Sequence, residues 1–249
     1  MTSPDLVIRF EHVSKAFGGV KVLDDVSFDV PRGNAFCILG RSGTGKSVTL
    51  KQLIGLIPPD QGKIFIEGEE ITGLPAWDLG RVRKRMGFLF QYSALFDSIT
   101  IGENVAFSLR RHTQCSEEEI REVVEHRLEQ VGLEGLYDKM PGELSGGMRK
   151  RAGLARALVL KPSVLLVDEP SSGLDPVTSA EIDELLLGLK REGGTTLVIV
   201  THNIPSARRV GDILVLLHQG RILEQGSAER FEKSEHPLVR EFMKSQGGN

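Results

Sequence analysis

A glycine-rich segment near the amino-terminal end has the spacing of a phosphate-binding loop. Residues 40–47 read Gly-Arg-Ser-Gly-Thr-Gly-Lys-Ser and match the pattern G-x-x-x-x-G-K-[ST]. Glycines allow backbone N–H groups to converge on phosphates, and the positive end of the following helix points at the same anion. Lys46 would reach the β- and γ-phosphates, and the Ser47 hydroxyl would bind Mg²⁺. The residues expected to contact the nucleotide are Gly40, Arg41, Ser42, Gly43, Thr44, Gly45, Lys46, Ser47 and Val48.

The alternative interpretation of this segment is a glycine turn that binds nothing. Its context argues for a ligand, because an apolar strand-like run at 35–39 precedes it and helical spacing of apolar residues follows Ser47. The sequence therefore predicts ATP with Mg²⁺ as cofactors.

Two carboxylates follow a second apolar run, 164–167, at the carboxyl end of an expected strand. Open α/β sheets bind their ligands at this edge. Asp168 would complete the Mg²⁺ site, and Glu169 would orient and deprotonate the attacking water. An acidic pair can also simply end a strand, so its presence in a chain that also carries the phosphate loop is what favours a catalytic role.

A serine and two glycines open a further expected helix, in the segment Leu-Ser-Gly-Gly-Met at 144–148. A helix that begins this way offers a second anion-binding end. The chain has one phosphate loop, so the second anion site is useful if it closes over nucleotide bound to another subunit. The segment resembles the signature sequence of ABC ATPases through Ser145, Gly146 and Gly147, although Met148 stands where the family usually has Gln.

The resemblance covers essentially the whole chain, because further motifs follow in the family's order. Gln91 matches the glutamine loop, Asp175 lies in a segment that resembles the D-loop, and His202 resembles the switch histidine. Phe17 falls where the family stacks an aromatic ring on adenine. Each residue alone is weak evidence, since a lone His after a strand is more often structural. Their joint order carries the resemblance.

The resemblance implies a homodimer with each nucleotide between two chains. Lys46 and Glu169 of one chain would face Ser145 of the other, and His202 would contact the γ-phosphate. Gln91 would bind Mg²⁺ and link the nucleotide to a helical insertion that docks on an integral membrane permease.

Two stretches are similar to the ATPases of Mla/Mce-type lipid transporters: SGGMRKRAGLARAL at 145–158 and SALFDSITIGENVAF at 93–107. In that family the ATPase joins a permease and a periplasmic lipid-binding MCE subunit. An importer ATPase for amino acids or another small solute remains an alternative. A non-transport ABC ATPase acting on DNA or ribosomes is less favoured, since neither a heptad run nor a second cassette occurs. A regulatory module without turnover is disfavoured by Glu169.

The elements that would position these residues are apolar runs alternating with helical patterns. Expected strands lie at 7–13, 26–30, 35–39, 63–67, 86–90, 164–167, 196–200, 213–217 and 221–224. The helix after Ser47 is expected to end at the two prolines 58–59, and Ser116 with Glu119 predicts a capping box. Buried strands alternating with helices predict a mostly parallel sheet.

We therefore expect one α/β domain, 1–249, with a RecA-like P-loop NTPase core, an antiparallel β edge and an inserted α-helical subdomain. The core would comprise 1–91 and 160–231, the helical subdomain with the signature 92–159, and a short tail 232–249.

Composition limits the remaining possibilities. A net charge of −3 gives no reason to expect nucleic acid as a partner. Two basic clusters, 81–85 and 149–151, are expected to be solvated helix faces, and Cys37 a buried reduced thiol. Neither a signal peptide nor a run of about 18 apolar residues is found, so a membrane role is expected to come through the permease, on the cytoplasmic face of the inner membrane.

Overall fold

The computed structural model describes residues 5–245, apart from the side chains of residues 192 and 193, and arranges its strands in two sheets. The first sheet is antiparallel, in the order β2-β1-β4-β5. Its strands are β1 (Leu6–Phe17), β2 (Val20–Pro31), β4 (Gln61–Ile66) and β5 (Glu69–Glu70).

The second sheet has the order β10-β9-β3-β8-β7-β6. Its strands are β3 (Ala35–Leu39), β6 (Met86–Leu89), β7 (Val164–Asp168), β8 (Thr196–Thr201), β9 (Ile213–His218) and β10 (Arg221–Gly226). All neighbours from β9 to β6 pair in parallel, and β10 is antiparallel at one edge. The prediction of a mostly parallel α/β sheet with antiparallel strands is confirmed.

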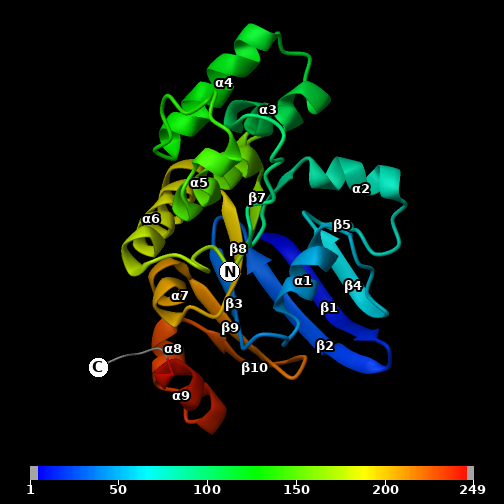
Figure 1. The fold of residues 1–249 in the computed structure, drawn as a ribbon. Helices are drawn as coiled ribbons and strands as arrows, with labels where there is room; N and C mark the ends of the chain where they lie inside the picture. Colours follow the sequence, from blue (N-terminus) through cyan, green and yellow to red (C-terminus); the bar gives the residue numbers. More distant parts are fainter. Residues whose placement is uncertain (1–4, 246–249) are drawn as a thin grey trace.

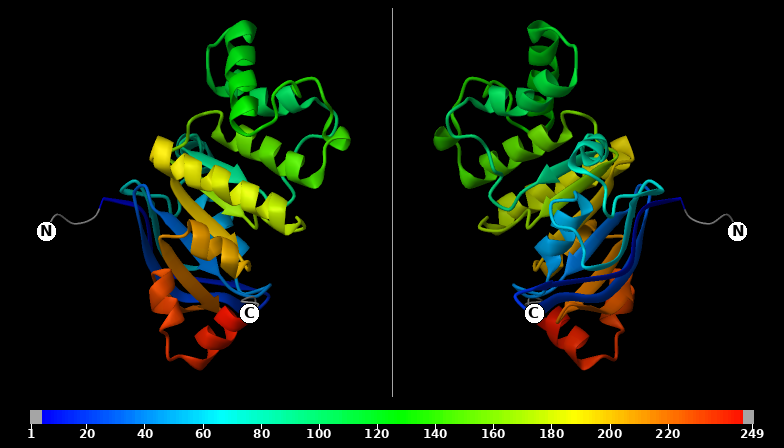
Figure 2. Two further views of the ribbon diagram at one scale, coloured as in Figure 1. Left: turned by 90° about the vertical axis from the view of Figure 1, so that its left-hand side faces the viewer. Right: turned by 90° about the vertical axis from the view of Figure 1, so that its right-hand side faces the viewer.

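The helices are arranged around this second sheet and at one end of the molecule. They are α1 (Lys46–Leu53), α2 (Ala76–Arg83), α3 (Ile101–His112), α4 (Glu117–Gln130), the 3-10 helix η1 (Pro141–Glu143), α5 (Gly146–Leu158), α6 (Pro176–Gly193), α7 (Ile204–Val210), α8 (Ala228–Glu232) and α9 (Pro237–Lys244). Figure 1 shows α3 and α4 at one end and α8 and α9 at the other. The side views in Figure 2 agree, with the sheets between these two ends.

Strand β3 separates two hydrophobic cores because its successive side chains point to opposite faces. Phe36 belongs to the core shared with the antiparallel sheet, where it stacks on Phe28 with ring centroids 5.0 Å apart. Cys37 and Leu39 belong to the second core, which the helices cover. Packing on both faces holds the carboxyl end of β3 in place, and the phosphate-loop segment begins there.

One local prediction is confirmed, and one is wrong. Ser116 and Glu119 form the expected capping box at the start of α4. Helix α1, however, ends at Leu53 and not at the prolines. Gly55 adopts φ 63, a left-handed conformation that favours glycine and ends a helix. The residues between Leu53 and the prolines, which the expected helix included, therefore follow it in a loop.

The predicted tail contains helix α9, but its last four residues, 246–249, lie outside the described residues, as do residues 1–4. Among the described helices, none is both long and apolar enough to cross a membrane.

Candidate active site

The predicted phosphate loop connects β3 to α1 and closes around a buried lysine. The Nζ of Lys46 donates hydrogen bonds to the carbonyl oxygens of Gly40, at 2.8 Å, and Arg41, at 3.1 Å. Gly45 adopts φ 103, and a Cβ there would lie 2.7 Å from the carbonyl oxygen of Val22. Only glycine fits this position without moving backbone, so the motif's second glycine is a geometric requirement.

The amino end of α1 suits a phosphate group. The first N–H groups of a helix have no partner within the helix, and no side chain caps this one. A Cβ built on Gly43 would meet nothing within 4 Å, so the loop is open beside this residue. Unpaired N–H groups, the helix dipole and Lys46 together match the chemistry of a triphosphate.

Two oxygen donors lie next to this loop, as a magnesium site requires. The Ser47 hydroxyl donates a hydrogen bond to Asp168 Oδ1 at 3.2 Å, although the two residues are separated by 121 positions. Asp168 ends β7, and burial raises the pKa of its carboxyl, an effect that the Ser47 bond partly offsets. Mg²⁺ is usually held by one or two carboxylates together with substrate phosphates, so this pair fits the ion.

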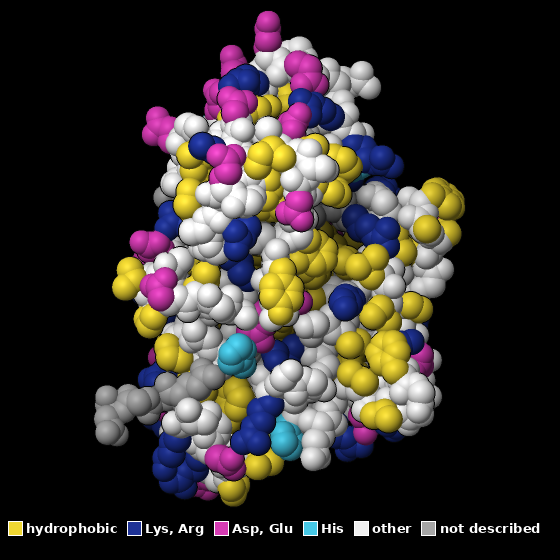
Figure 3. Space-filling model, viewed as in Figure 1, with side chains coloured by type: hydrophobic (Ala, Val, Ile, Leu, Met, Phe, Trp, Pro, Cys, Tyr) yellow, Lys and Arg dark blue, Asp and Glu magenta, His cyan; other side chains and the backbone are white. Residues whose placement is uncertain are grey.

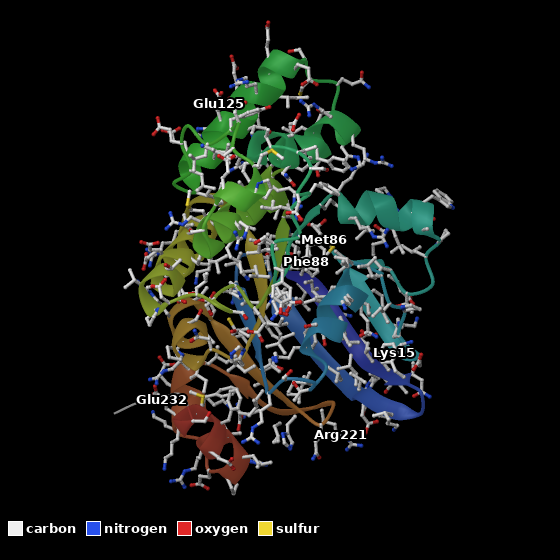
Figure 4. All side chains as sticks on the ribbon, in the orientation of Figure 1. Lys15, Met86, Phe88, Glu125, Arg221 and Glu232 are labelled. Carbon is white, nitrogen blue, oxygen red and sulfur yellow. The ribbon has the colours of Figure 1, made fainter. Side chains whose placement is uncertain are left out.

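Gln91 lies beside the same cleft, two residues after the end of β6. Its Nε2 donates to Ser172 Oγ at 3.5 Å, a long hydrogen bond. Figure 4 shows Met86 and Phe88 of β6, the strand that precedes Gln91, near the centre of the molecule.

The carboxylate of Glu169 is the centre of a three-residue cluster. Its Oε1 lies 3.5 Å from Lys46 Nζ, and its Oε2 lies 2.9 Å from His202 Nδ1 and accepts from the His202 backbone N–H at 3.2 Å. Glu169 is buried, while 52% of the His202 side chain is exposed. The backbone of Glu169 has φ 48, in the left-handed region that a non-glycine residue rarely occupies. Such conformations cluster at functional sites.

These groups surround a cleft of about 520 Å³. The predicted nucleotide and catalytic residues that line it are Arg41, Ser42, Gly43, Gly45, Lys46, Ser47, Val48, Gln91, Glu169 and His202. Thr44 and Gly40 belong to the same loop without lining the cleft. Phe17 also lies outside the lining, at the end of β1, where 45% of it is exposed and Lys15 Nζ lies 5.4 Å from its ring centroid.

The signature residues lie elsewhere. Ser145 is the N-cap of α5, and its hydroxyl accepts from the Met148 N–H at 3.2 Å. A Cβ on Gly147 would lie 2.4 Å from Thr178 Cγ2, whereas Gly146 is exposed. None of residues 145–147 is among the described residues that line the cleft. The amino end of α5 is therefore not part of its own chain's cleft.

Asp175 has a local structural role. It is the N-cap of α6, where its Oδ1 accepts from the N–H groups of Val177 and Thr178, each at 3.0 Å. The Thr178 hydroxyl also donates to this carboxylate, and these bonds lower the pKa of Asp175. The residue thus fixes the start of α6 beside the D-loop segment.

One prediction about the basic clusters is wrong. Lys150 is only 4% exposed, and its Nζ donates to the carbonyl oxygens of Gln91 and of Glu169, the latter at 3.0 Å. Burial lowers its pKa to about 8, although the nearby carboxylates partly oppose this shift. Spacing on α5 could have revealed the burial, since Gly147 and Leu154, three residues before and four after, are buried on the same helix face.

The first basic cluster is also only partly solvated. Arg83 donates to the carbonyl oxygens of Ile54, at 2.8 Å, and Gly55, at 3.2 Å. Arg85 pairs with Glu67 and Glu69, while Arg81 and Lys84 are exposed as expected.

Comparison with known proteins decides the family. The model of the family described as "ABC transporter" matches residues 23–172. The chain belongs to the ABC transporter family. It is an ATP-hydrolysing subunit of this family, as its sequence and site residues predicted.

Two curated relatives match this ABC ATPase over nearly its whole length. The "Probable ribonucleotide transport ATP-binding protein mkl" of Mycobacterium leprae is 46% identical over 238 residues, which are 96% of this chain and 69% of that protein. The "Intermembrane phospholipid transport system ATP-binding protein MlaF" of Escherichia coli K12 is 39% identical over 237 residues, 95% of this chain and 88% of that protein. The chain thus spans about two-thirds of the mycobacterial protein.

A solved structure supports the fold. A dimeric ATP-binding cassette in a post-hydrolysis state, bound to ADP and Pi, matches with a TM-score of 0.83 and 32% identity, over 88% of this chain and 98% of that one.

Proposed function

We propose that this ABC ATPase works as a homodimer that binds two ATP between its subunits and drives a membrane permease for phospholipid or a related lipid. The location of Ser145 is the observation that most directly supports the dimer. The amino end of α5 would bind an anion, as helix amino ends can, and it is not part of its own chain's cleft, so the nucleotide that it contacts would be bound to a second chain. The similar cassette with ADP and Pi is itself dimeric.

Within one chain the residues divide the work of ATP hydrolysis. Lys46 and the amino end of α1 would neutralise the phosphates, while Ser47, Asp168 and Gln91 would hold Mg²⁺. When bound, Mg²⁺ would neutralise the charge that develops on the transferred phosphoryl group.

Glu169 would accept a proton from the attacking water, and His202 would hold this carboxylate in place through two contacts to Oε2. On ATP binding, Lys46 would exchange Glu169 for phosphate oxygens, which frees the carboxylate for the water. Phe17 would stack on adenine from outside the cleft, because its ring is largely accessible at the end of β1.

An exposed aromatic surface next to Gln91 suits the permease. Tyr92 is 86% exposed, and Phe96 and Phe107 are each 46% exposed with ring centroids 5.2 Å apart. Figure 3 shows hydrophobic side chains gathered near the middle of the face that it draws. Aromatic side chains are enriched at protein interfaces. Docking there would place the ATPase on the cytoplasmic face of the inner membrane, held by the permease.

The lipid assignment rests on similarity. MlaF, which is named for intermembrane phospholipid transport, aligns over 88% of its own length. We therefore propose a periplasmic MCE-type lipid-binding subunit as a further partner. The name of the Mycobacterium leprae relative favours ribonucleotide transport as the second candidate.

The dimer model is tested with Ser145→Arg in the assembled ATPase–permease complex. A long cation at the amino end of α5 should block turnover because it cannot share the partner's nucleotide site. ATP binding to the isolated subunit should be unchanged, since Ser145 does not line that subunit's cleft. The matched control is Ser116→Arg, at the N-cap of α4, which should hydrolyse ATP normally. Normal turnover in Ser145→Arg would contradict the shared site.

The substrate is tested in proteoliposomes that contain the same complex. ATP-dependent movement of a fluorescent phospholipid is expected, with no accumulation of ribonucleotides or amino acids. Accumulation of either solute without lipid movement would refute the lipid proposal and leave the ATPase dimer intact.

A further inference from the structure

Helix α5 supplies a buried cation that reaches two backbone carbonyls of the catalytic site. Lys150 Nζ donates to the carbonyl oxygen of Gln91 and, at 3.0 Å, to that of Glu169. A lysine is almost never fully buried unless its ammonium group is paired. The two carbonyls provide hydrogen-bond acceptors for the Lys150 ammonium group, so these bonds offset the cost of its burial.

The Glu169 backbone needs this support. With φ 48, the residue is in a conformation that costs on the order of 1 kcal/mol or more and persists only where surrounding contacts enforce it. Its N–H donates to the Val200 carbonyl at 2.9 Å, and its own carbonyl accepts from Lys150 Nζ at 3.0 Å and from the Ser172 N–H at 3.2 Å. These bonds hold both peptide groups of Glu169, and the bond from Lys150 is the one that connects this carbonyl to α5.

The same helix also holds the loop after Gln91 with a second cation. Arg156 donates to the carbonyl oxygens of Ser93 and Ala94, each at 2.6 Å. Both loop residues have left-handed backbone conformations. Arg156 thus anchors the loop as Lys150 does, but without a bond to Glu169, which makes it a natural comparison.

We propose that Lys150 is a positioning residue that couples helix α5 to the catalytic site: it fixes the peptide of Glu169 and the carbonyl of Gln91 to the helix that begins at Ser145. Contact between Ser145 and the partner's nucleotide would then be transmitted through α5 to the alignment of Glu169 within the same chain. This inference rests on the proposed role of Glu169 as the base. It explains why a lysine lies in the interior at the junction of β6, β7 and α5.

The test compares Lys150→Met, which keeps length and removes the donor, with Lys150→Gln, which keeps an N–H donor. Lys150→Met should lower kcat by about 100-fold, the effect of a small misplacement of a catalytic group. The KM for ATP and the binding of a fluorescent ATP analogue should remain within about twofold of the parental values. Lys150→Gln should restore a large part of kcat, and Arg156→Met should lower kcat by less than about tenfold.

A double variant separates positioning from general damage. In the Glu169→Gln background, Lys150→Met should cause no further loss of single-turnover rate, because both changes act on one group. Parental kcat in Lys150→Met, or a loss of ATP binding in parallel with kcat, would overturn the proposal. If Lys150→Met does not fold, Lys150→Ala, which also lacks the donor, decides: a lowered kcat at unchanged KM supports the proposal, and a parental kcat refutes it. Full turnover in Glu169→Gln alone would instead refute the role of the base.

Discussion

Replacing Glu169 by glutamine removes the charge and basicity of the carboxylate while it keeps the shape of the side chain. A glutamine side chain has nearly the same size, and its carbonyl oxygen can still accept the His202 N–H that Glu169 Oε2 accepts now. The negative charge and the basic oxygen are lost. The variant should therefore fold normally and bind nucleotide.

Two effects are expected in Glu169→Gln, one on the rate of hydrolysis and one on ATP affinity. Loss of a general base lowers a rate by about 10²–10⁴-fold, which corresponds to roughly 3–5 kcal/mol in the activation free energy. The ion pair between Lys46 Nζ and Glu169 Oε1, at 3.5 Å, competes with phosphate for the lysine. Its removal also removes a negative charge beside the triphosphate, so ATP affinity should be equal or higher.

Phosphate release measures kcat, and a fluorescent ATP analogue measures binding. The matched control is Glu125→Gln on α4, at the far end of the molecule, which should behave as the parental protein (Figure 4). Parental turnover in Glu169→Gln would refute the base assignment. A large loss of ATP affinity would refute the competition between Glu169 and phosphate for Lys46.

Three further predictions follow from burial and capping. Asp183→Asn should raise the Tm at pH 7, because burial raises the pKa of this carboxyl despite the hydrogen bond that it accepts from Ser206. The cost of burying the ionised carboxylate is present above the folded-state pKa and disappears as the pH falls below the unfolded-state pKa. The gain in Tm should therefore vanish in acid. Cys37, whose pKa burial raises to about 12, should resist maleimide in the native protein while exposed Cys115 reacts; labelling of both would contradict the buried core. Asp175→Ala should lower the Tm by several degrees through loss of the α6 N-cap, whereas Asp175→Asn should keep the parental Tm. Equal Tm values for Asp175→Ala and the parental protein in differential scanning calorimetry would refute the capping role.

The sequence predicted those parts of the site that depend on strand order and local motifs. The apolar run before Asp168 identified a buried strand, and parallel pairing then brings its carboxyl end to the phosphate loop, which is why Ser47 and Asp168 meet across 121 residues. The helical spacing of Ile120, Val124 and Leu128 in the sequence likewise matches the buried face of α4.

The remaining features depend on tertiary contacts that periodicity does not encode. The end of α1 is set by the conformation of Gly55, where a Cβ would lie 2.7 Å from Leu79 Cδ2 on α2, so this position depends on a contact between the loop after α1 and a separate helix. Spacing on α5 indicates that Lys150 is buried, but its partners, the carbonyls of Gln91 after β6 and Glu169 after β7, come from tertiary structure. The left-handed backbone of Glu169 leaves no signal in residue type.

The shared nucleotide site is tested most directly by a cysteine cross-link between subunits. The chain would carry two new cysteines, Ser42→Cys in the phosphate loop and Ser145→Cys at the start of α5. Cys115→Ser would remove the exposed native thiol, and Glu169→Gln would stop turnover. A short bifunctional maleimide should give a covalent dimer with ATP and much less with ADP. ATP-loaded protein that yields no intersubunit product, while both cysteines remain reactive, would contradict the account.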